Sequence, residues 1–275
     1  MTTEKPEYGG RPAYGYDAPV VQNFYSLHAS DGTTGYFLPH LKSGMALLDC
    51  GCGPGTITLG LAQAVAPAQA TGIDIEPGMI EQAKAFAAER QVDNVEFQVA
   101  DIRDLPFSDN SFDVVLTSAV LEHLGDPERA LKELHRVVKK GGLVGVVNTD
   151  WGDPLISPEN ESVSRFFEIF ERGFNLYGGS LNRGRHARRM MREAGLDVFE
   201  FKALYGLASD PEAVQASMEG FIGWIENVPI FDQAIELGWT DTAEIQSIIA
   251  GMREWARHPD ALIGTGRTEA VARKP

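Results

Sequence analysis

The sequence predicts an α/β protein: a seven-stranded, mostly parallel sheet with helices on both faces, plus helical lid and insertion segments. Short apolar runs alternate with amphipathic helical patterns, and the links between them are short. A turn with three glycines follows the first apolar run, which is typical of a strand leading into a helix. A chain of 275 residues can hold one large domain with a helical elaboration.

The first four strands are predicted in the amino-terminal half. The apolar run from Leu47 ends in the glycine turn, and an Ala/Leu-rich helix continues to about Val65. Pro77 is well placed at the start of the next helix, because its fixed φ suits the first helical turn. The second, third and fourth strands are expected at 70–75, 95–99 and 112–118.

The remaining three strands and two more helices follow with clear boundary signals. Asp126 before Pro127 is typical of a helix start, and Gly141-Gly142 of a helix end. Another helix is expected from about His186 to Ala194, where arginines face solvent opposite an apolar stripe. The fifth, sixth and last strands are expected at 143–148, 197–205 and 267–273.

Two segments break the alternation and set the predicted domain organisation. We expect an N-terminal helical lid at 1–42 and a helical insertion at 206–264. The core then comprises 43–205 and 265–275, with a substrate-side insertion at about 151–182. The 206–264 insertion is also the expected interface if the chain forms a homodimer.

Composition excludes several classes of partner. The formal net charge of −15 disfavours nucleic acid, which needs clustered Lys and Arg. The apolar runs are too short to span a membrane, and the opening residues lack the apolar core of a signal peptide, so we expect a cytoplasmic protein. Cys50 and Cys52 are too few for a metal site and poorly placed for a disulfide, so no metal is expected.

The glycine turn narrows the choice of ligand. Its glycines occupy positions 51, 53 and 55, which differs from the G-x-G-x-x-G spacing typical of dinucleotide binding. Asp49 precedes the turn, where a carboxylate would repel a pyrophosphate and attract an amino group. Asp101 ends the third strand and suits an adenine amine. These features favour a cationic, nucleoside-bearing ligand without phosphates over a nicotinamide dinucleotide.

Four motifs in order carry a family resemblance: LLDCGCGPGTIT, GIDIEPGMI, VADIRDLPFSDNSFDVVLTSAVLEHL and LKELHRVVKKGGLVGVV. With them the chain resembles the class I S-adenosylmethionine-dependent methyltransferases, and more closely the type-11 group of small-molecule enzymes related to quinone-biosynthesis methyltransferases. The resemblance is strong from about Met45 to Asp150. It implies a Rossmann-like sheet, S-adenosyl-L-methionine as cofactor and S-adenosyl-L-homocysteine as product.

The resemblance assigns the methionine end of the cofactor to the glycine turn. Gly51 and Gly53 would let the backbone approach it, and Cys52 would be a small residue that fits beside the cofactor. Asp49, behind the turn, would help to hold the amino group. Ser118, at the end of the fourth strand, would lie beside the methionine portion, although it could instead cap the following helix.

The resemblance assigns the nucleoside end to the next two strands. Asp74 would accept both ribose hydroxyls, because a carboxylate can bind a vicinal diol with two oxygens. Ile75 and Met79 would pack on the adenine, Asp101 would accept its amine, and the Ile102 N–H would meet a ring nitrogen. Structural roles stay open for three of these: a helix cap for Asp74, a turn for Asp101 and core packing for Met79.

The predicted reaction is in-line methyl transfer to O, N or C of a small, apolar or aromatic metabolite. His123 is the candidate general base, with a structural histidine as the competing interpretation; Tyr25, His28 and His186 are weaker candidates. Aromatic residues at 151–182 and 206–264 could line the acceptor site or form core. Two alternatives remain: a methyltransferase-fold protein that is non-catalytic or repurposed, and an NAD-type oxidoreductase.

Overall fold

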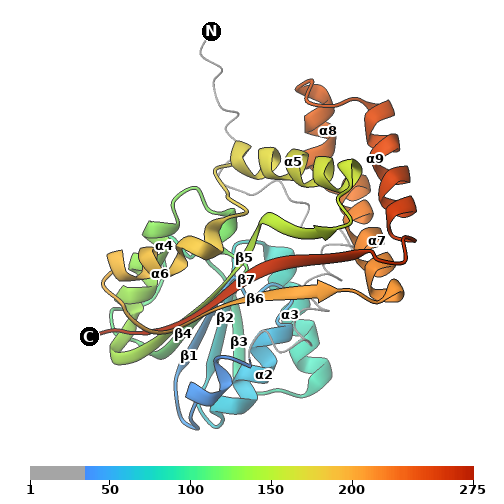
Figure 1. Cartoon of the computed structure of the whole chain (residues 1–275). Coiled ribbons are helices and arrows are strands. Elements are labelled where there is room, and N and C mark those ends of the chain that lie inside the picture. The colour runs from blue at the N-terminus through green and yellow to red at the C-terminus, as the bar shows by residue number, and fades with distance from the viewer. Residues whose placement is uncertain (1–34) are drawn as a thin grey trace.

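A computed structural model describes residues 35–275 and contains one seven-stranded sheet in the order β3-β2-β1-β4-β5-β7-β6 (Figure 1). Strands β1 to β5 are parallel, and β7 runs antiparallel between β5 and β6. The predicted fold class is thereby confirmed. Most of the predicted lid at 1–42, with Tyr25 and His28, lies outside the described residues, which include only its end and the short helix η1 (Leu38–His40).

The first half of the sheet follows the predicted alternation closely. Every residue of β1 is buried, because this strand is central and both sheet faces are covered. The elements of this half are β1 (Leu47–Cys50), α2 (Thr56–Val65), β2 (Ala70–Asp74), α3 (Pro77–Arg90), β3 (Val95–Val99) and β4 (Phe112–Ser118).

The second half of the sheet continues beyond β4. Asp126 caps the first helix there by accepting a hydrogen bond from the Arg129 N–H, as its sequence position predicts. The elements are η2 (Leu121–His123), α4 (Pro127–Val137), β5 (Val138–Ser157), α6 (Arg183–Glu193), β6 (Asp197–Ala208) and β7 (Leu262–Arg273).

Two apolar clusters, one on each face, hold the helices against the sheet. Helices α2 and α3 pack on one face together with Phe37, which is fully buried. Helices α4 and α6 pack on the other, where Ala187, Met190 and Met191 of α6 are buried and Arg185, Arg188, Arg189 and Arg192 are exposed, as the amphipathic pattern predicts.

The last three strands are longer than the sequence indicates, and the expected strand limits at 143–148, 197–205 and 267–273 are wrong. Figure 1 shows β5, β6 and β7 running beyond the other strands toward α7. The Gly152-Asp153-Pro154 stretch looks like a strand breaker. The ladder with β7 is irregular between Asp150 and Leu155 and then resumes, so the breaker forms a bulge within the strand.

Four helices build a third apolar cluster on these extended strands. They are α5 (Glu161–Leu176), α7 (Pro211–Asn227), α8 (Pro229–Glu236) and α9 (Thr242–Trp255). Phe166 and Phe170 of α5 are fully buried in it, so much of the aromatic density at 151–182 is core rather than binding surface.

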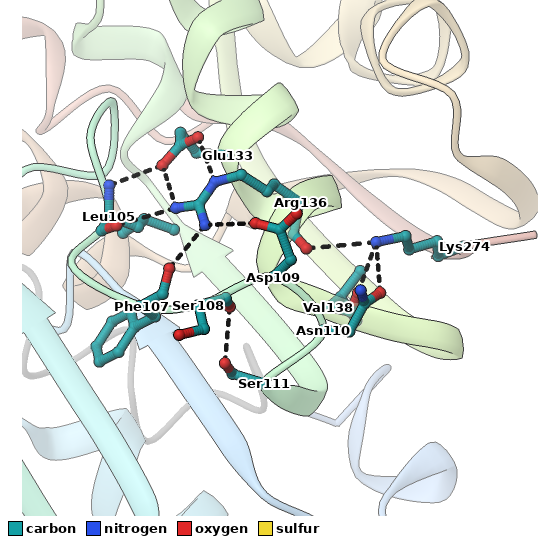
Figure 2. A network of polar contacts seen from close by, with 10 residues as sticks. All are labelled: Leu105, Phe107, Ser108, Asp109, Asn110, Ser111, Glu133, Arg136, Val138 and Lys274. Carbon is teal, nitrogen blue, oxygen red and sulfur yellow. Dashed lines mark hydrogen bonds and ion pairs between the residues drawn. The ribbon is translucent and has the colours of Figure 1, made fainter.

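A polar network fixes the loop between β3 and β4 (Figure 2). Arg136 of α4 donates from Nη2 to the Leu105 carbonyl at 2.9 Å and from Nη1 to the Phe107 carbonyl at 2.7 Å. Glu133 accepts from the Leu105 N–H at 2.8 Å and also pairs with Arg136. Asp101 belongs to the same loop, which α4 thus ties down at Leu105 and Phe107.

Candidate functional site

A pocket opens at the carboxyl ends of the parallel strands, where ligands bind in open α/β sheets. Its lining includes residues from the glycine turn, the ends of β2, β3 and β4, and the extended part of β5 and β7. Of the predicted cofactor-binding residues, all but Asp49 line it, and the candidate base His123 lines it too; the lining ones are Gly51, Cys52, Gly53, Asp74, Ile75, Met79, Asp101, Ile102 and Ser118.

The glycine turn has a backbone that side chains would disrupt. Gly51 has a φ of +79°, and a Cβ there would lie 2.2 Å from Cγ2 of Val120. Gly53 has a φ of +52°, but a Cβ there would meet nothing within 4 Å. The turn therefore packs against the loop after β4 at Gly51 and leaves open space at Gly53, where a ligand can approach the backbone.

Asp74, at the end of β2, is held by the backbone. Its Oδ2 accepts from the Gly53 N–H and its Oδ1 from the Glu76 N–H, both at 2.9 Å. Burial raises the pKa of Asp74, and these hydrogen bonds oppose that effect. A carboxylate has about four acceptor sites, so the fixed carboxylate keeps capacity for a ligand's hydroxyl groups.

Asp101 also lines the pocket, but its carboxylate is occupied by Arg103. The Arg103 Nη2 lies 2.7 Å from Oδ2, and Nε lies 3.0 Å from Oδ1. Burial alone would raise the pKa of Asp101, but the hydrogen bonds and charge of Arg103 outweigh it and lower the pKa. An adenine amine would have to share this carboxylate with the guanidinium.

Asp49 lies behind the turn, as expected, but does not reach the pocket. Only 2% of it is exposed, and its Oδ2 accepts a 2.6 Å hydrogen bond from the Thr58 hydroxyl of α2. Burial raises the pKa of Asp49 to about 7, although the Thr58 hydrogen bond opposes this. The carboxylate thus ties β1 to α2, and the structure provides no direct path from it to a ligand's amino group.

His123 lines the pocket at the end of η2. Its ring lies 5.3 Å from that of Phe174, centroid to centroid. Burial lowers the pKa of His123 from 6.5 to about 3, so the imidazole is neutral at pH 7. A base of this strength removes a proton poorly, so the environment argues against the predicted role as general base.

Glu122 is a site residue that the sequence analysis missed. It is 1% exposed, and its carboxylate accepts from the Asn148 side chain at 2.6 Å and the Thr149 hydroxyl at 2.9 Å. Its backbone carbonyl accepts from the Ser180 N–H at 2.8 Å. Glu122 therefore fixes η2, and His123 with it, to β5. A charged residue within LEHL gives no sequence signal for this role.

The far wall of the pocket is apolar and comes from distant parts of the chain. Trp151 and Trp224 lie with ring centroids 5.7 Å apart, and Phe174 and Leu181 complete this wall. Arg267 of β7 also lines the pocket and was missed, because it falls in a strand that looked purely structural. His186, by contrast, is exposed on α6 and away from the pocket.

Within residues 35–275, no group of three or more His, Cys, Asp or Glu side chains could hold a metal ion. The helices of this same region are too short or too polar to cross a membrane.

Comparisons with known proteins place the chain among methyltransferases. A family profile described as "Methyltransferase domain" matches residues 41–203. An uncharacterized methyltransferase of Schizosaccharomyces pombe is 31% identical over 64% of this chain and 65% of its own length. A demethylmenaquinone methyltransferase of Lactobacillus johnsonii is 31% identical over 66% of this chain and 77% of its own. The chain spans 45% to 65% of the length of three of the curated proteins that it matches.

Solved structures share the fold at lower identity. The [4+2]-cyclase SpnF superposes with a TM-score of 0.55 at 23% identity, over 91% of this chain and 80% of the cyclase. This likeness shows the fold alone, and it shows that the fold also serves a cyclase. The family match over most of the chain, together with the glycine turn and the carboxylates that follow it, shows that the chain belongs to the class I S-adenosylmethionine-dependent methyltransferase family.

Proposed function

We propose that this protein transfers the methyl group of S-adenosylmethionine to a small, apolar or aromatic metabolite. One observation carries the proposal: a single pocket joins the turn and carboxylates of the family motifs to an apolar wall of Trp151, Phe174 and Trp224. The first part suits a nucleoside-bearing cation, and the second suits an apolar acceptor.

The residues of the cofactor side fit S-adenosylmethionine on structural grounds. The open space at Gly53 leaves room for the methionine portion, and the two oxygens of Asp74 suit the ribose diol. Ile75, Met79 and Ile102 provide an apolar lining for the adenine. When bound, the cofactor supplies an already activated methyl group on its sulfonium sulfur.

The chain's own residues then orient the acceptor and exclude water. Methyl transfer needs the acceptor atom in line with the methyl–sulfur bond, and an enclosed apolar wall favours that alignment by limiting the acceptor's motion. Because the pKa of His123 is about 3, we assign His123 to the wall of the site, where its neutral ring packs on Phe174.

Calorimetry with S-adenosylhomocysteine tests cofactor binding. The wild type should bind it, and Asp74→Ala should lose at least about thirtyfold in affinity, because two hydrogen bonds to a charged group are removed. Asp93→Ala, an exposed acidic position outside the pocket, is the matched control and should bind like the wild type. Thermal melts check that each variant is folded. No binding by the wild type, or unchanged binding by Asp74→Ala, contradicts the proposal.

A transfer assay separates methyl transfer from the second candidate function, a repurposed reaction. The fold shared with the [4+2]-cyclase motivates this second candidate. Wild-type protein, methyl-labelled S-adenosylmethionine and a panel of aromatic and isoprenoid metabolites should yield a labelled product. Cofactor binding without label transfer to any acceptor, but with chemical change in one of them, would favour the repurposed reaction.

Two further expectations belong to this proposal: a homodimer and a cytoplasmic location. The dimer would use the surface of α7 to α9, within the 206–264 insertion. Sedimentation at several concentrations should give twice the monomer mass of 30.0 kDa, and cell fractionation tests the location.

A further inference from the structure

Arg267 is unusual among the arginines of residues 35–275 because its hydrogen-bonding groups are poorly satisfied. Its Nε is enclosed and meets no hydrogen-bond acceptor. Its one ion pair joins Nη2 to Oε1 of Glu269 at 3.1 Å. Arg185, for comparison, forks onto Asp150 through Nε and Nη2 at 2.9 and 2.5 Å. An enclosed cationic donor without an acceptor destabilises the folded protein, so a ligand that supplies the missing acceptor would account for its presence.

Arg267 lies on the lining of the pocket, where a ligand could supply the missing acceptor. Arg183 also has an enclosed Nε without an acceptor, but it does not line the pocket, whereas Arg267 does. Arg267 lies opposite Thr149 in the β5–β7 ladder, and Thr149 lines the same pocket. The Arg267 side chain, 27% exposed, thus shares the pocket lining with Trp151 and Trp224.

The charges around the pocket limit what Arg267 can bind. Arg103, which also lines the pocket, is taken up by Asp101. The carboxylate of Glu122 is taken up by Asn148 and Thr149. Among the lining residues within 35–275, Arg267 is the arginine whose enclosed Nε has no acceptor, while its Nη2 pairs with Glu269. One guanidinium matches a planar monoanion, whereas a phosphate dianion beside several carboxylates would need more positive charge.

We propose that the methyl acceptor carries a carboxylate that binds Arg267 while its apolar body packs on Trp151, Phe174 and Trp224. The acceptor class is then an apolar or aromatic carboxylic acid. This inference rests on the proposed function, because it places the acceptor in the same pocket as the cofactor.

A matched pair of probes tests the carboxylate: 2-naphthoate and its neutral counterpart 2-naphthalenemethanol. Calorimetry is carried out with protein saturated with S-adenosylhomocysteine. The wild type should prefer the acid by about tenfold or more, and Arg267→Gln should lose that preference while binding the alcohol unchanged. Arg253→Gln is the control: it removes an exposed arginine of α9 that pairs with Glu219 of α7, and it should retain the preference for the acid.

Three results would overturn the inference: equal binding of acid and alcohol by the wild type, binding of neither, or a preference that survives in Arg267→Gln. If Arg267→Gln does not fold, Arg267→Lys decides, because it keeps a cation beside Glu269 but removes the planar fork. A fall of about threefold or more in its affinity for the acid supports the inference, and an unchanged affinity overturns it. Failure of the wild type to bind S-adenosylhomocysteine, in contrast, is failure of the proposed function itself.

Discussion

The two sides of the pocket are built in different ways. The cofactor side comes from short, consecutive pieces of chain: the glycine turn, the end of β2 and the end of β3. Its key carboxylate, Asp74, is fixed by backbone N–H groups. The acceptor side comes from residues far apart in the sequence, from Trp151 to Arg267, and is fixed by packing. Under the proposed function, the side held by backbone hydrogen bonds binds the cofactor, and we expect acceptor specificity to come from the packed side.

The largest expected effect falls on the cofactor side, at Gly51. Gly51→Ala should lower the free energy of unfolding by about 3–5 kcal/mol and abolish cofactor binding, because the new Cβ clashes with Val120 in a left-handed backbone. Denaturant unfolding and calorimetry measure both. Gly44→Ala is the matched control, since Gly44 also has a positive φ, +88°, but has nothing within 4 Å of its Cβ position. Equal losses in the two variants would contradict the clash as the cause.

Asp49, behind the turn, should make stability depend on pH. Its pKa is about 7 in the folded protein and 3.8 in the reference state, so between pH 4 and 7 the folded form holds a proton that the unfolded form has released. The contribution of this group is therefore lost as pH rises through that window, by up to about 4 kcal/mol. From pH 5 to 8, the free energy of unfolding of Asp49→Asn should fall less than that of the wild type. Parallel curves of free energy against pH for the two proteins would contradict the account.

Glu122 joins the two sides by fixing η2 to β5. Glu122→Gln should cost about 1–3 kcal/mol of stability, because the amide turns a donor toward the buried Asn148 or Thr149 donors. Glu226→Gln, an exposed position on α7, is the control and should change stability by less than about 0.5 kcal/mol. Urea unfolding of the two variants provides the measurement, and a neutral Glu122→Gln would show that this junction is not needed.

The smallest expected effect concerns His123. Because its pKa is about 3, the rate of methyl transfer should show no inflection near pH 6.5 arising from this ring. His123→Gln should lower the rate less than about tenfold, through altered packing against Phe174, and leave the pH profile unchanged in shape. An inflection near pH 6.5 in the wild type that disappears in His123→Gln would restore the role of general base.

The difference between the cofactor side and the acceptor side also explains how much could be predicted from the sequence. The strands up to β4 and the positions of Gly53, Asp74 and Asp101 follow from local patterns: an apolar run, a turn and the residue at a strand's end. Arg267 and Glu122 could not be found this way. Arg267 matters because β7 extends beyond the core alongside β5, and Glu122 because its partners Asn148 and Thr149 lie on another strand. Both depend on tertiary contacts that no local pattern encodes.

Asp49 and His123 show where a motif position misleads about chemistry. The resemblance assigns Asp49 to the amino group of the cofactor, and the position of His123 after the fourth strand makes it the candidate base, yet burial decides what each group can do. Asp49 is enclosed against Thr58, and His123 loses the proton affinity that a base requires. Neither environment is visible until the neighbouring elements are in place.

A crystal structure with S-adenosylhomocysteine tests the central claim most directly. It should show the ribose hydroxyls on Asp74 and the sulfur directed toward the wall of Trp151, Phe174 and Trp224. A ligand whose ribose lies away from Asp74, or whose sulfur faces α3 rather than that wall, would contradict the division of the pocket into a cofactor side and an acceptor side.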